Sequence, residues 1–356
     1  MQTLMNLRKK LQEKDLDAML VLGAANRRYL SGFTGSAATL LISQDAAVLI
    51  TDFRYIEQAT AQAPEFEVRR YEDYLSTVKE VLEENGCRRV GFESDIVTYD
   101  QYTRWQEQLK EIEWVPAPGL VEELRMIKSD EEIASIARAA AISDEAWAEL
   151  LPQMRPGVTE KELALELEFL MRRKGAEGLA FNIILASGPN GALPHAVPSD
   201  RPLQEGDLVV MDFGARVNGY CSDMTRTVVI GKACQRTRTL YNIVLDAQLA
   251  AVAAVKAGKT GKEIDAVARG LISDAGYGEN FGHGLGHSVG LAIHEDPRLA
   301  PKAETVLQPG MVVTVEPGIY IPGFGGVRIE DLVVVTETGC RILTQSTKDL
   351  VELGSE

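Results

Sequence analysis

The first 94 residues alternate between apolar runs and amphipathic stretches. Short apolar runs have the length and composition of strands: 18–23 (AMLVLG), 37–43 (AATLLIS), 46–51 (AAVLIT) and 88–94 (RRVGFES). Amphipathic stretches predict helices: the N-terminal MQTLMNLRKKLQEKDLDAML, YIEQATAQA (55–63) and YEDYLSTVKEVLEENGC (71–87). This alternation predicts a small α/β domain.

The pattern changes near residue 122. In VPAPGLVEELRMIKSDEEI (115–133), prolines and a glycine precede Ser129 and Glu132, a capping box that predicts the start of a long helix. A chain of 356 residues is also too long for one ordinary core. We therefore predict two domains, residues 1–122 and 123–356.

The second part contains an internal repeat. RPGVTEKELALEL (155–167) resembles KAGKTGKEIDAVA (256–268), and each contains a Thr-x-x-Glu capping box. EGDLVVMDFG (205–214) resembles PGMVVTVEPG (309–318), which aligns Asp212 with Glu316. The matched spans predict a duplicated α+β unit whose halves face each other.

The segment 208–230 (LVVMDFGARVNGYCSDMTRTVVI) has the composition of a buried hairpin but contains two aspartates. Asn218-Gly219 is a strong signal for the turn, because both residues tolerate positive φ. Strand alternation then places Asp212 and Asp223 diagonally on one face, roughly 5–8 Å apart. Two carboxylates this close are tolerable in apolar surroundings only with a positive partner.

By the same parity, the nearby Arg216 and Arg226 fall on a face with fewer reasons to meet the acids, so a divalent metal ion is the more economical partner. The same part of the chain supplies further metal-binding side chains: His283, His287, His294, Glu316 and Glu330. Four carboxylates with one imidazole favour hard or borderline ions and suffice for two of them. Two ions can activate a water molecule and polarise a carbonyl, so the residues predict metal-assisted hydrolysis.

Composition excludes several other classes of function. The formal net charge is −15, which argues against nucleic acid or an anionic membrane as a partner. The four cysteines have no zinc-binding spacing, which indicates free thiols in a reduced compartment. The N-terminus has no apolar signal core, and no run reaches the roughly 18 apolar residues of a membrane span. We expect a cytoplasmic protein.

The order Asp212, Asp223, His287, Glu316 and Glu330, with the motifs GHGLGH, HE and EPGIY, resembles the aminopeptidase P/prolidase group of metallopeptidases (peptidase family M24). The resemblance covers nearly the whole chain. It implies a creatinase-like α/β domain followed by an α+β catalytic domain with the pita-bread fold and its internal pseudo-two-fold repeat. It also implies a homodimer.

The resemblance implies a role for each ligand. Asp212 binds one ion, Asp223 and Glu330 bridge two ions, and His287 and Glu316 complete the second. Glu316 also serves as base and then acid for the attacking water. Manganese is the expected metal, with cobalt, zinc or iron as alternatives.

Other residues match the group's substrate site. His195, His283 and His294 match histidines that hold the scissile carbonyl, the tetrahedral oxyanion or the proline ring. Arg328 matches an arginine that braces the metal shell or contacts the substrate. A plain salt bridge from Arg328 to Asp331 or Glu330 is the alternative.

The resemblance implies hydrolysis of Xaa-Pro peptide bonds. We expect Xaa-Pro dipeptides as substrates, with Xaa-Pro aminopeptidase (aminopeptidase P) activity on longer peptides as the alternative. A dipeptidase needs a cation for the free carboxylate, and Arg54 and Arg328 are candidates. In the group, the N-terminal domain often reaches a partner subunit's site, where Arg54 or Tyr55 would limit substrate length. An ordinary structural cluster with Asp52 is the interpretation we favour.

Rival functions within the same fold are less well supported. A methionine aminopeptidase shares the ligand set, but the N-terminal domain and the surroundings of His195 (LPHAVPS) favour the proline-directed branch. Creatinase lacks the acids, and a non-catalytic binding module would have lost ligands that this chain keeps.

Overall fold

The structure is a computed structural model that describes residues 2–354. The chain divides into two compact units, one ending at Arg125 and the other beginning at Met126. None of the helices in the described part of the chain combines the length and the apolar character needed to cross a bilayer. The four cysteines are free thiols, as the sequence predicts.

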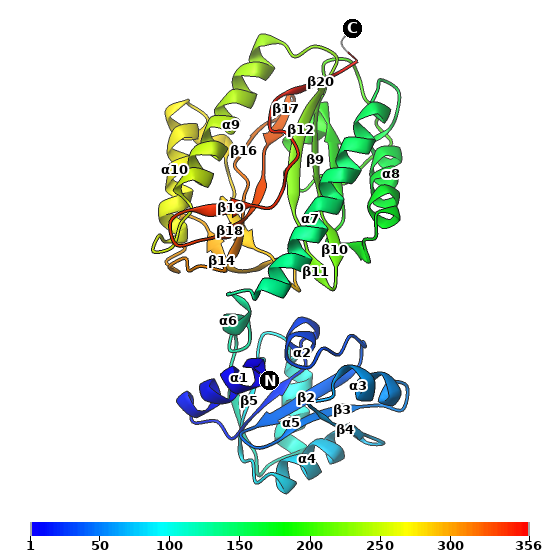
Figure 1. Cartoon of the computed structure of the whole chain (residues 1–356), viewed down its shortest axis with the longest axis vertical. Coiled ribbons are helices and arrows are strands. Elements are labelled where there is room, and N and C mark those ends of the chain that lie inside the picture. Colours follow the sequence, from blue (N-terminus) through cyan, green and yellow to red (C-terminus); the bar gives the residue numbers. More distant parts are fainter. Residues whose placement is uncertain (1, 355–356) are drawn as a thin grey trace. The chain divides into compact units, whose positions relative to one another are not determined.

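The N-terminal unit is built around a mixed six-stranded sheet in the order β4-β3-β2-β1-β5-β6 (Figure 1). Its strands are β1 (Ala18–Val21), β2 (Ala38–Ser43), β3 (Ala47–Thr51), β4 (Glu67–Arg70), β5 (Arg89–Phe92) and β6 (Glu113–Pro116). Its helices are α1 (Gln2–Glu13), α2 (Ala24–Ser31), α3 (Ile56–Gln62), α4 (Tyr74–Glu84), α5 (Tyr99–Gln108) and α6 (Glu122–Arg125). Strand β1 is an unbroken apolar run because it is buried on both faces: Met19 and Val21 belong to one core, and Ala18 and Leu20 to the other.

The strands and helices that the sequence predicts within residues 1–94 are present. The apolar pattern does not predict β4, because its sequence EVRR lies at the edge of the sheet and is partly exposed. An edge strand of this kind has no buried face to impose alternation on its sequence.

The C-terminal unit contains two larger sheets, β20-β12-β9-β8 and β14-β13-β15-β18-β19, and the smaller sheets β11-β10-β7 and β16-β17. Its helices are α7 (Asp130–Leu150), η1 (Leu151–Gln153), α8 (Glu160–Arg173), η2 (Gly188–Ala192), α9 (Gln235–Ala254), α10 (Gly261–Asp274) and η3 (Gly278–Asn280). The strands before α9 are β7 (Gly178–Leu179), β8 (Ile184–Ser187), β9 (Leu208–Phe213), β10 (Ala215–Val217), β11 (Tyr220–Cys221) and β12 (Met224–Ile230). The strands after α10 are β13 (Gly286–Ser288), β14 (Glu295–Leu299), β15 (Val312–Val315), β16 (Gly318–Ile321), β17 (Gly325–Arg328), β18 (Asp331–Val335), β19 (Cys340–Ile342) and β20 (Val351–Leu353).

The two halves of this unit repeat one arrangement, which confirms the predicted duplication. In the first half the chain runs α7-α8-β8-β9-β12, and the strands lie in the order β12-β9-β8. In the second it runs α9-α10-β13-β15-β18, and the order β18-β15-β13 is the same. Helices α7 and α8 share an apolar core with the first sheet, and α9 and α10 share one with the second (Figure 1).

The predicted capping boxes are present at the starts of α7, α8 and α10. The side chains of Ser129, Thr159 and Thr260 each accept a hydrogen bond from the third helical N–H, and the glutamate at that position returns the bond. Each such cap stabilises its helix by about 1 kcal/mol. The common start of α8 and α10 is therefore a local property of the repeated sequence.

The predicted hairpin register is confirmed. Val217 pairs with Tyr220 around a turn in which Asn218 and Gly219 have φ values of 50° and 79°. The same register continues into β9 and β12, where Asp212 pairs with Thr225. This register brings residue 223 back beside the end of β9.

Candidate active site and metal centre

The predicted metal ligands come from both halves of the C-terminal unit. They are Asp212 on β9, Asp223 just before β12, His287 on β13, Glu316 just after β15 and Glu330 just before β18. Three of them thus stand at short breaks between strands, where the alternation of a sheet does not fix the side-chain direction. The halves are joined here, because the backbone N–H of Glu330 donates to the Thr225 carbonyl at 3.1 Å.

Asp212, Asp223 and Glu330 form a tight group of carboxylates. One oxygen from each lies within 4.8 Å of the other two. Burial, and secondly the charge of Glu330, raise the pKa of Asp223 well above its usual value. Burial and the charge of Glu316 do the same to the pKa of Glu330. These carboxylates can all be ionised together only if a cation shares the space.

His287 faces this group. Its Nε2 atom lies 3.5 Å from Asp223 Oδ2 and 3.4 Å from Glu316 Oε1. Its Nδ1 atom lies 3.1 Å from the Ser288 carbonyl oxygen, which can only accept, so Nδ1 carries the hydrogen. Burial lowers the pKa of His287 to about 4, so the ring is neutral and its Nε2 lone pair points toward the carboxylates.

The donor set fits divalent metal ions. Asp212 Oδ1 and Glu330 Oε1 are buried, and neither has a hydrogen-bond partner among residues 2–354. A buried carboxylate oxygen without a partner is costly, and a cation bound between the side chains would satisfy both atoms. Carboxylate oxygens with one neutral imidazole suit manganese, cobalt, iron or zinc rather than a thiolate-binding metal.

Arg328 braces this group from one side. Its Nη2 atom donates to Asp212 Oδ2 at 2.7 Å, and its Nε atom donates to the Thr225 hydroxyl at 2.9 Å. Thr225 in turn donates to Glu330 Oε2 at 2.7 Å. The guanidinium therefore orients two carboxylates, one directly and one through Thr225, while Asp212 Oδ1 stays available.

The alternative expectation, a salt bridge from Arg328 to Asp331 or Glu330, is wrong. Asp331 pairs instead with Arg226, at 2.9 Å, and with Lys348. Adjacent residues on a strand face opposite sides of the sheet. Thr225 therefore faces Glu330 and the other carboxylates, whereas Arg226 faces the opposite side, where it meets Asp331. The sequence therefore predicts correctly that Arg226 is not the partner of Asp212 and Asp223.

A chain of hydrogen bonds links Arg328 to His283 through Tyr320. Arg328 Nη1 donates to the Tyr320 hydroxyl at 2.8 Å, and this hydroxyl lies 2.9 Å from His283 Nε2. His283 Nδ1 lies 2.8 Å from the Gly284 carbonyl, so Nδ1 is the donor and Tyr320 donates to Nε2. Both ring nitrogens of His283 thus have protein partners. Tyr320 lies in the EPGIY motif, and the sequence reasoning gave neither it nor Thr225 a role.

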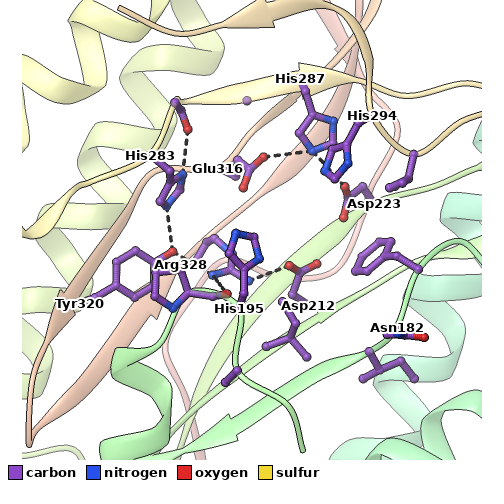
Figure 2. Close-up of a pocket in the computed structure, with 18 of the residues that line it drawn as sticks. Asn182, His195, Asp212, Asp223, His283, His287, His294, Glu316, Tyr320 and Arg328 are labelled. Carbon is purple, nitrogen blue, oxygen red and sulfur yellow. Dashed lines mark hydrogen bonds and ion pairs between the residues drawn. The ribbon is translucent and has the colours of Figure 1, made fainter. Parts of the chain in front are cut away.

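The site opens into a cavity of about 710 Å³. Ring and aliphatic side chains line one part of it: Phe181, Ile183, Ile184, Val197 and Ile293. His195 and His294 are exposed at its wall, and Figure 2 shows the His195 ring pointing into the cavity. The ring of His294 packs against that of His287, with centroids 4.5 Å apart.

The cation that would bind a substrate carboxylate differs from expectation, since Arg54 and Arg328 are the expected candidates. Arg328 is only 3% exposed and is engaged with Asp212, so it is not a free clamp for a substrate carboxylate. Arg298, which the sequence reasoning missed, lines the cavity with 47% of its side chain exposed. Arg54 lies in the N-terminal unit, where it pairs with Asp52 at 2.7 Å and stacks over Tyr55.

Comparison with known proteins places this geometry in a family. Residues 134–337 match metallopeptidase family M24, and residues 4–127 match the creatinase/prolidase N-terminal domain. The chain belongs to metallopeptidase family M24. The predicted family and fold class are thereby confirmed, and family M24 is a family of divalent-metal peptidases.

Several family members resemble the chain along its whole length. A structure of the Xaa-Pro dipeptidase from Bacillus anthracis is 48% identical, with a TM-score of 0.97 and 99% of each chain covered. A structure of the X-Pro aminopeptidase from Thermotoga maritima MSB8 is 40% identical, with a TM-score of 0.92 and coverage of 98% and 99%. The Xaa-Pro dipeptidase from Pyrococcus furiosus is 38% identical over 346 residues, which are 96% of this chain and 97% of that protein.

The buried carboxylates predict that metal binding depends on pH. Burial raises the pKa of Glu316 from 4.5 to about 7, so in the metal-free protein this group holds a proton that the unfolded chain has already lost. Metal-free stability should therefore fall as pH rises from about 4.5 to about 7, and metal should remove this penalty. We expect the gain in melting temperature on adding manganese to be larger at pH 7.5 than at pH 5.5.

Proton release measures the same effect directly. Titration calorimetry of manganese binding in buffers of different ionisation enthalpy should show protons released at pH 6.5. Glu316→Gln should reduce that number, because it removes one titrating group. A binding enthalpy that is the same in every buffer would contradict the assignment.

Proposed function

We propose that this protein is a dinuclear metal-dependent hydrolase of Xaa-Pro peptide bonds, with Xaa-Pro dipeptides as its substrates. One observation carries the proposal: Asp212, Asp223 and Glu330 form one group of carboxylates, and two of its buried oxygens have no hydrogen-bond partner among residues 2–354. His287 lies beside both Asp223 and Glu316, and so adds Glu316 to the site. The names of the relatives supply the peptide class, since two are Xaa-Pro dipeptidases and one is an X-Pro aminopeptidase. In this proposal residues 1–122 form the creatinase-like domain and residues 123–356 the catalytic domain.

In the proposed site those five side chains hold two divalent ions. When bound, such ions supply Lewis acidity and activate a water molecule. Glu316 then serves as the base that takes a proton from that water and as the acid that passes it to the leaving nitrogen. A glutamate carboxylate at this place suits the double role, because it can accept a proton and then donate it.

The exposed imidazoles fit a bond to proline. An Xaa-Pro bond has no N–H, so the enzyme must recognise the carbonyl and the ring rather than a donor. We assign His195 and His294, which face the cavity, to the scissile carbonyl, the tetrahedral oxyanion and the proline ring. His283 lines the cavity too, but its nitrogens bond Tyr320 and Gly284, so we assign it a role through Tyr320 and Arg328.

A free carboxylate distinguishes a dipeptide from a longer substrate. Arg298 supports the dipeptidase assignment, because its exposed guanidinium lines the cavity and can bind such a carboxylate. Aminopeptidase P activity on longer peptides is the alternative, favoured by the likeness to the X-Pro aminopeptidase.

Manganese is the proposed metal, and a cytoplasmic homodimer is the proposed form. A monomeric mass in sedimentation equilibrium would contradict the dimer.

Substrate length is tested by direct comparison. The manganese-loaded protein should cleave a Met-Pro dipeptide with a higher kcat/KM than a Met-Pro-Ala-Ala peptide, chelation should abolish both activities, and manganese should restore them. Asp223→Ala is the control, because it should lose bound metal and cleavage together. If Asp223→Ala binds as much metal and cleaves as fast as the wild-type protein, the hydrolase assignment is wrong. If the wild-type protein cleaves the longer peptide faster than the dipeptide, aminopeptidase P activity is favoured.

The role of Glu316 is tested by Glu316→Gln, which keeps the shape of the side chain but removes the base. Loss of a general base lowers kcat by about 10²- to 10⁴-fold. Thr314→Val is the matched control: Thr314 donates to Glu316 Oε1 at 3.0 Å, so its loss should have a much smaller effect. If Glu316→Gln with its metal content verified keeps wild-type kcat, another group is the base.

A further inference from the structure

The loop that carries His195 is held at both ends by one buried carboxylate. Glu160, the first residue of α8, is fully buried. Its Oε1 accepts from the Ser187 N–H and hydroxyl, both at 2.7 Å, and its Oε2 accepts from the Ser199 N–H at 2.9 Å and hydroxyl at 2.6 Å. Asn190 adds a further donor at 3.1 Å. Ser187 ends β8 and Ser199 closes the loop, so Glu160 bonds both stems. Two further hydrogen bonds cross between the stems, from Arg201 Nη1 to the Ser187 hydroxyl at 2.5 Å and from Asn190 to the Ser199 hydroxyl at 3.2 Å.

The tip of this loop has little packing of its own. Leu193 is 61% exposed, Val197 is 80% exposed and His195 is exposed, whereas only Ala196 among the residues between them is buried. Among residues 2–354, this tip is hydrogen-bonded to the catalytic side through the Pro194 carbonyl, which accepts from Arg328 Nη1 at 3.4 Å. The position of His195 therefore depends on how the stems are fixed.

The duplicated half shows that helix α8 does not need this carboxylate in order to form. Both α8 and α10 begin with a threonine capping box, and their first residues bond the returning loop alike: Glu160 N–H donates to the Arg201 carbonyl at 3.2 Å, and Gly261 N–H to the Thr305 carbonyl at 3.3 Å. The position equivalent to Glu160 is thus glycine in the second half.

The reason for that glycine lies in the second loop. A Cβ atom on Gly261 would lie 2.0 Å from the Arg298 carbonyl oxygen, because strand β14 passes directly over it. Pairing of β14 with β13 fixes the loop that carries His294. Residues 188–199 form no strand, and the first loop is instead bonded to the carboxylate of Glu160.

We propose that Glu160 is a positioning residue for His195, in that it fixes the loop 188–199 so that the His195 imidazole faces the substrate. The role of His195 in catalysis rests on the proposed function. The bonds from Glu160 to the loop are observed in the structure and do not depend on it. Within residues 2–354, Glu160 has no hydrogen bond to a predicted metal ligand, and its bonds to Ser187 and Ser199 lead to the loop that carries His195.

The test is Glu160→Gln, which preserves size but replaces one of the two acceptor oxygens by an amide donor. Whichever way the amide turns, the N–H of either Ser187 or Ser199 loses its acceptor. Hydrogen exchange should become faster in the peptides that cover residues 188–199 and stay unchanged around the metal ligands. Glu162→Gln is the matched control, because it removes a carboxylate of the same helix that bonds only its own cap. Unchanged exchange in Glu160→Gln overturns the proposal whether or not the protein is a peptidase.

Activity tests the link to His195. On the Met-Pro dipeptide, Glu160→Gln should lower kcat/KM roughly 10- to 100-fold with metal content unchanged. In a His195→Ala background the same substitution should change kcat/KM by less than about two-fold, because the residue through which it acts is gone. An equal loss in both backgrounds would show a merely structural role and overturn the proposal.

A milder variant guards against misfolding. Ser199→Ala removes one hydroxyl donor and keeps the backbone bond to Glu160, so it should give a smaller loss of the same sign that also vanishes with His195→Ala. A loss that persists in that background would overturn the proposal. If the wild-type protein does not cleave Xaa-Pro bonds, the proposed function fails, while the exchange experiment still decides whether Glu160 orders the loop.

Discussion

The structure depends on the placement of four carboxylates against one imidazole where burial leaves them little contact with water. Asp223 and Glu330 are almost fully buried. Burial and the charge of Glu330 raise the pKa of Asp223, and burial and the charge of Glu316 raise the pKa of Glu330. Only opposite charge or protonation makes such a cluster tolerable. The surrounding fold is best understood as the framework that gathers these groups and gives each the partner it needs.

Two guanidinium groups divide that task. Arg328 orients the carboxylates, whereas Arg226 lies behind them, where it bonds the Glu330 carbonyl and pairs with Asp331. Arg226 also donates to the Ser346 carbonyl, so the C-terminal segment is tied to the residue that precedes β18. A buried ion pair of this kind costs about 3–5 kcal/mol when one partner is removed, so the backbone at Glu330 is held firmly before any metal binds.

The sequence predicts the parts of this arrangement that are set by local rules. The capping boxes at Thr159 and Thr260 and the hairpin at Asn218 depend on a few adjacent residues, and all are present. The partner of Arg328 depends on a contact with Asp212 across 116 positions of the chain, which no local pattern encodes. The role of Glu160 is hidden for the same reason: Ser187 and Ser199 reach it only after the loop has closed.

Charge arithmetic favours two ions over one. Asp212, Asp223, Glu316 and Glu330 with the cation of Arg328 carry a formal charge of minus three when ionised, and neutral His287 adds nothing. One divalent ion would leave the buried site with a net negative charge, which would repel an anionic transition state. Two would leave it with a single positive charge, which stabilises the developing oxyanion of the substrate carbonyl. In the proposed enzyme Arg328 therefore does more than brace Asp212: its charge offsets one carboxylate, and the site with two ions keeps a net positive charge.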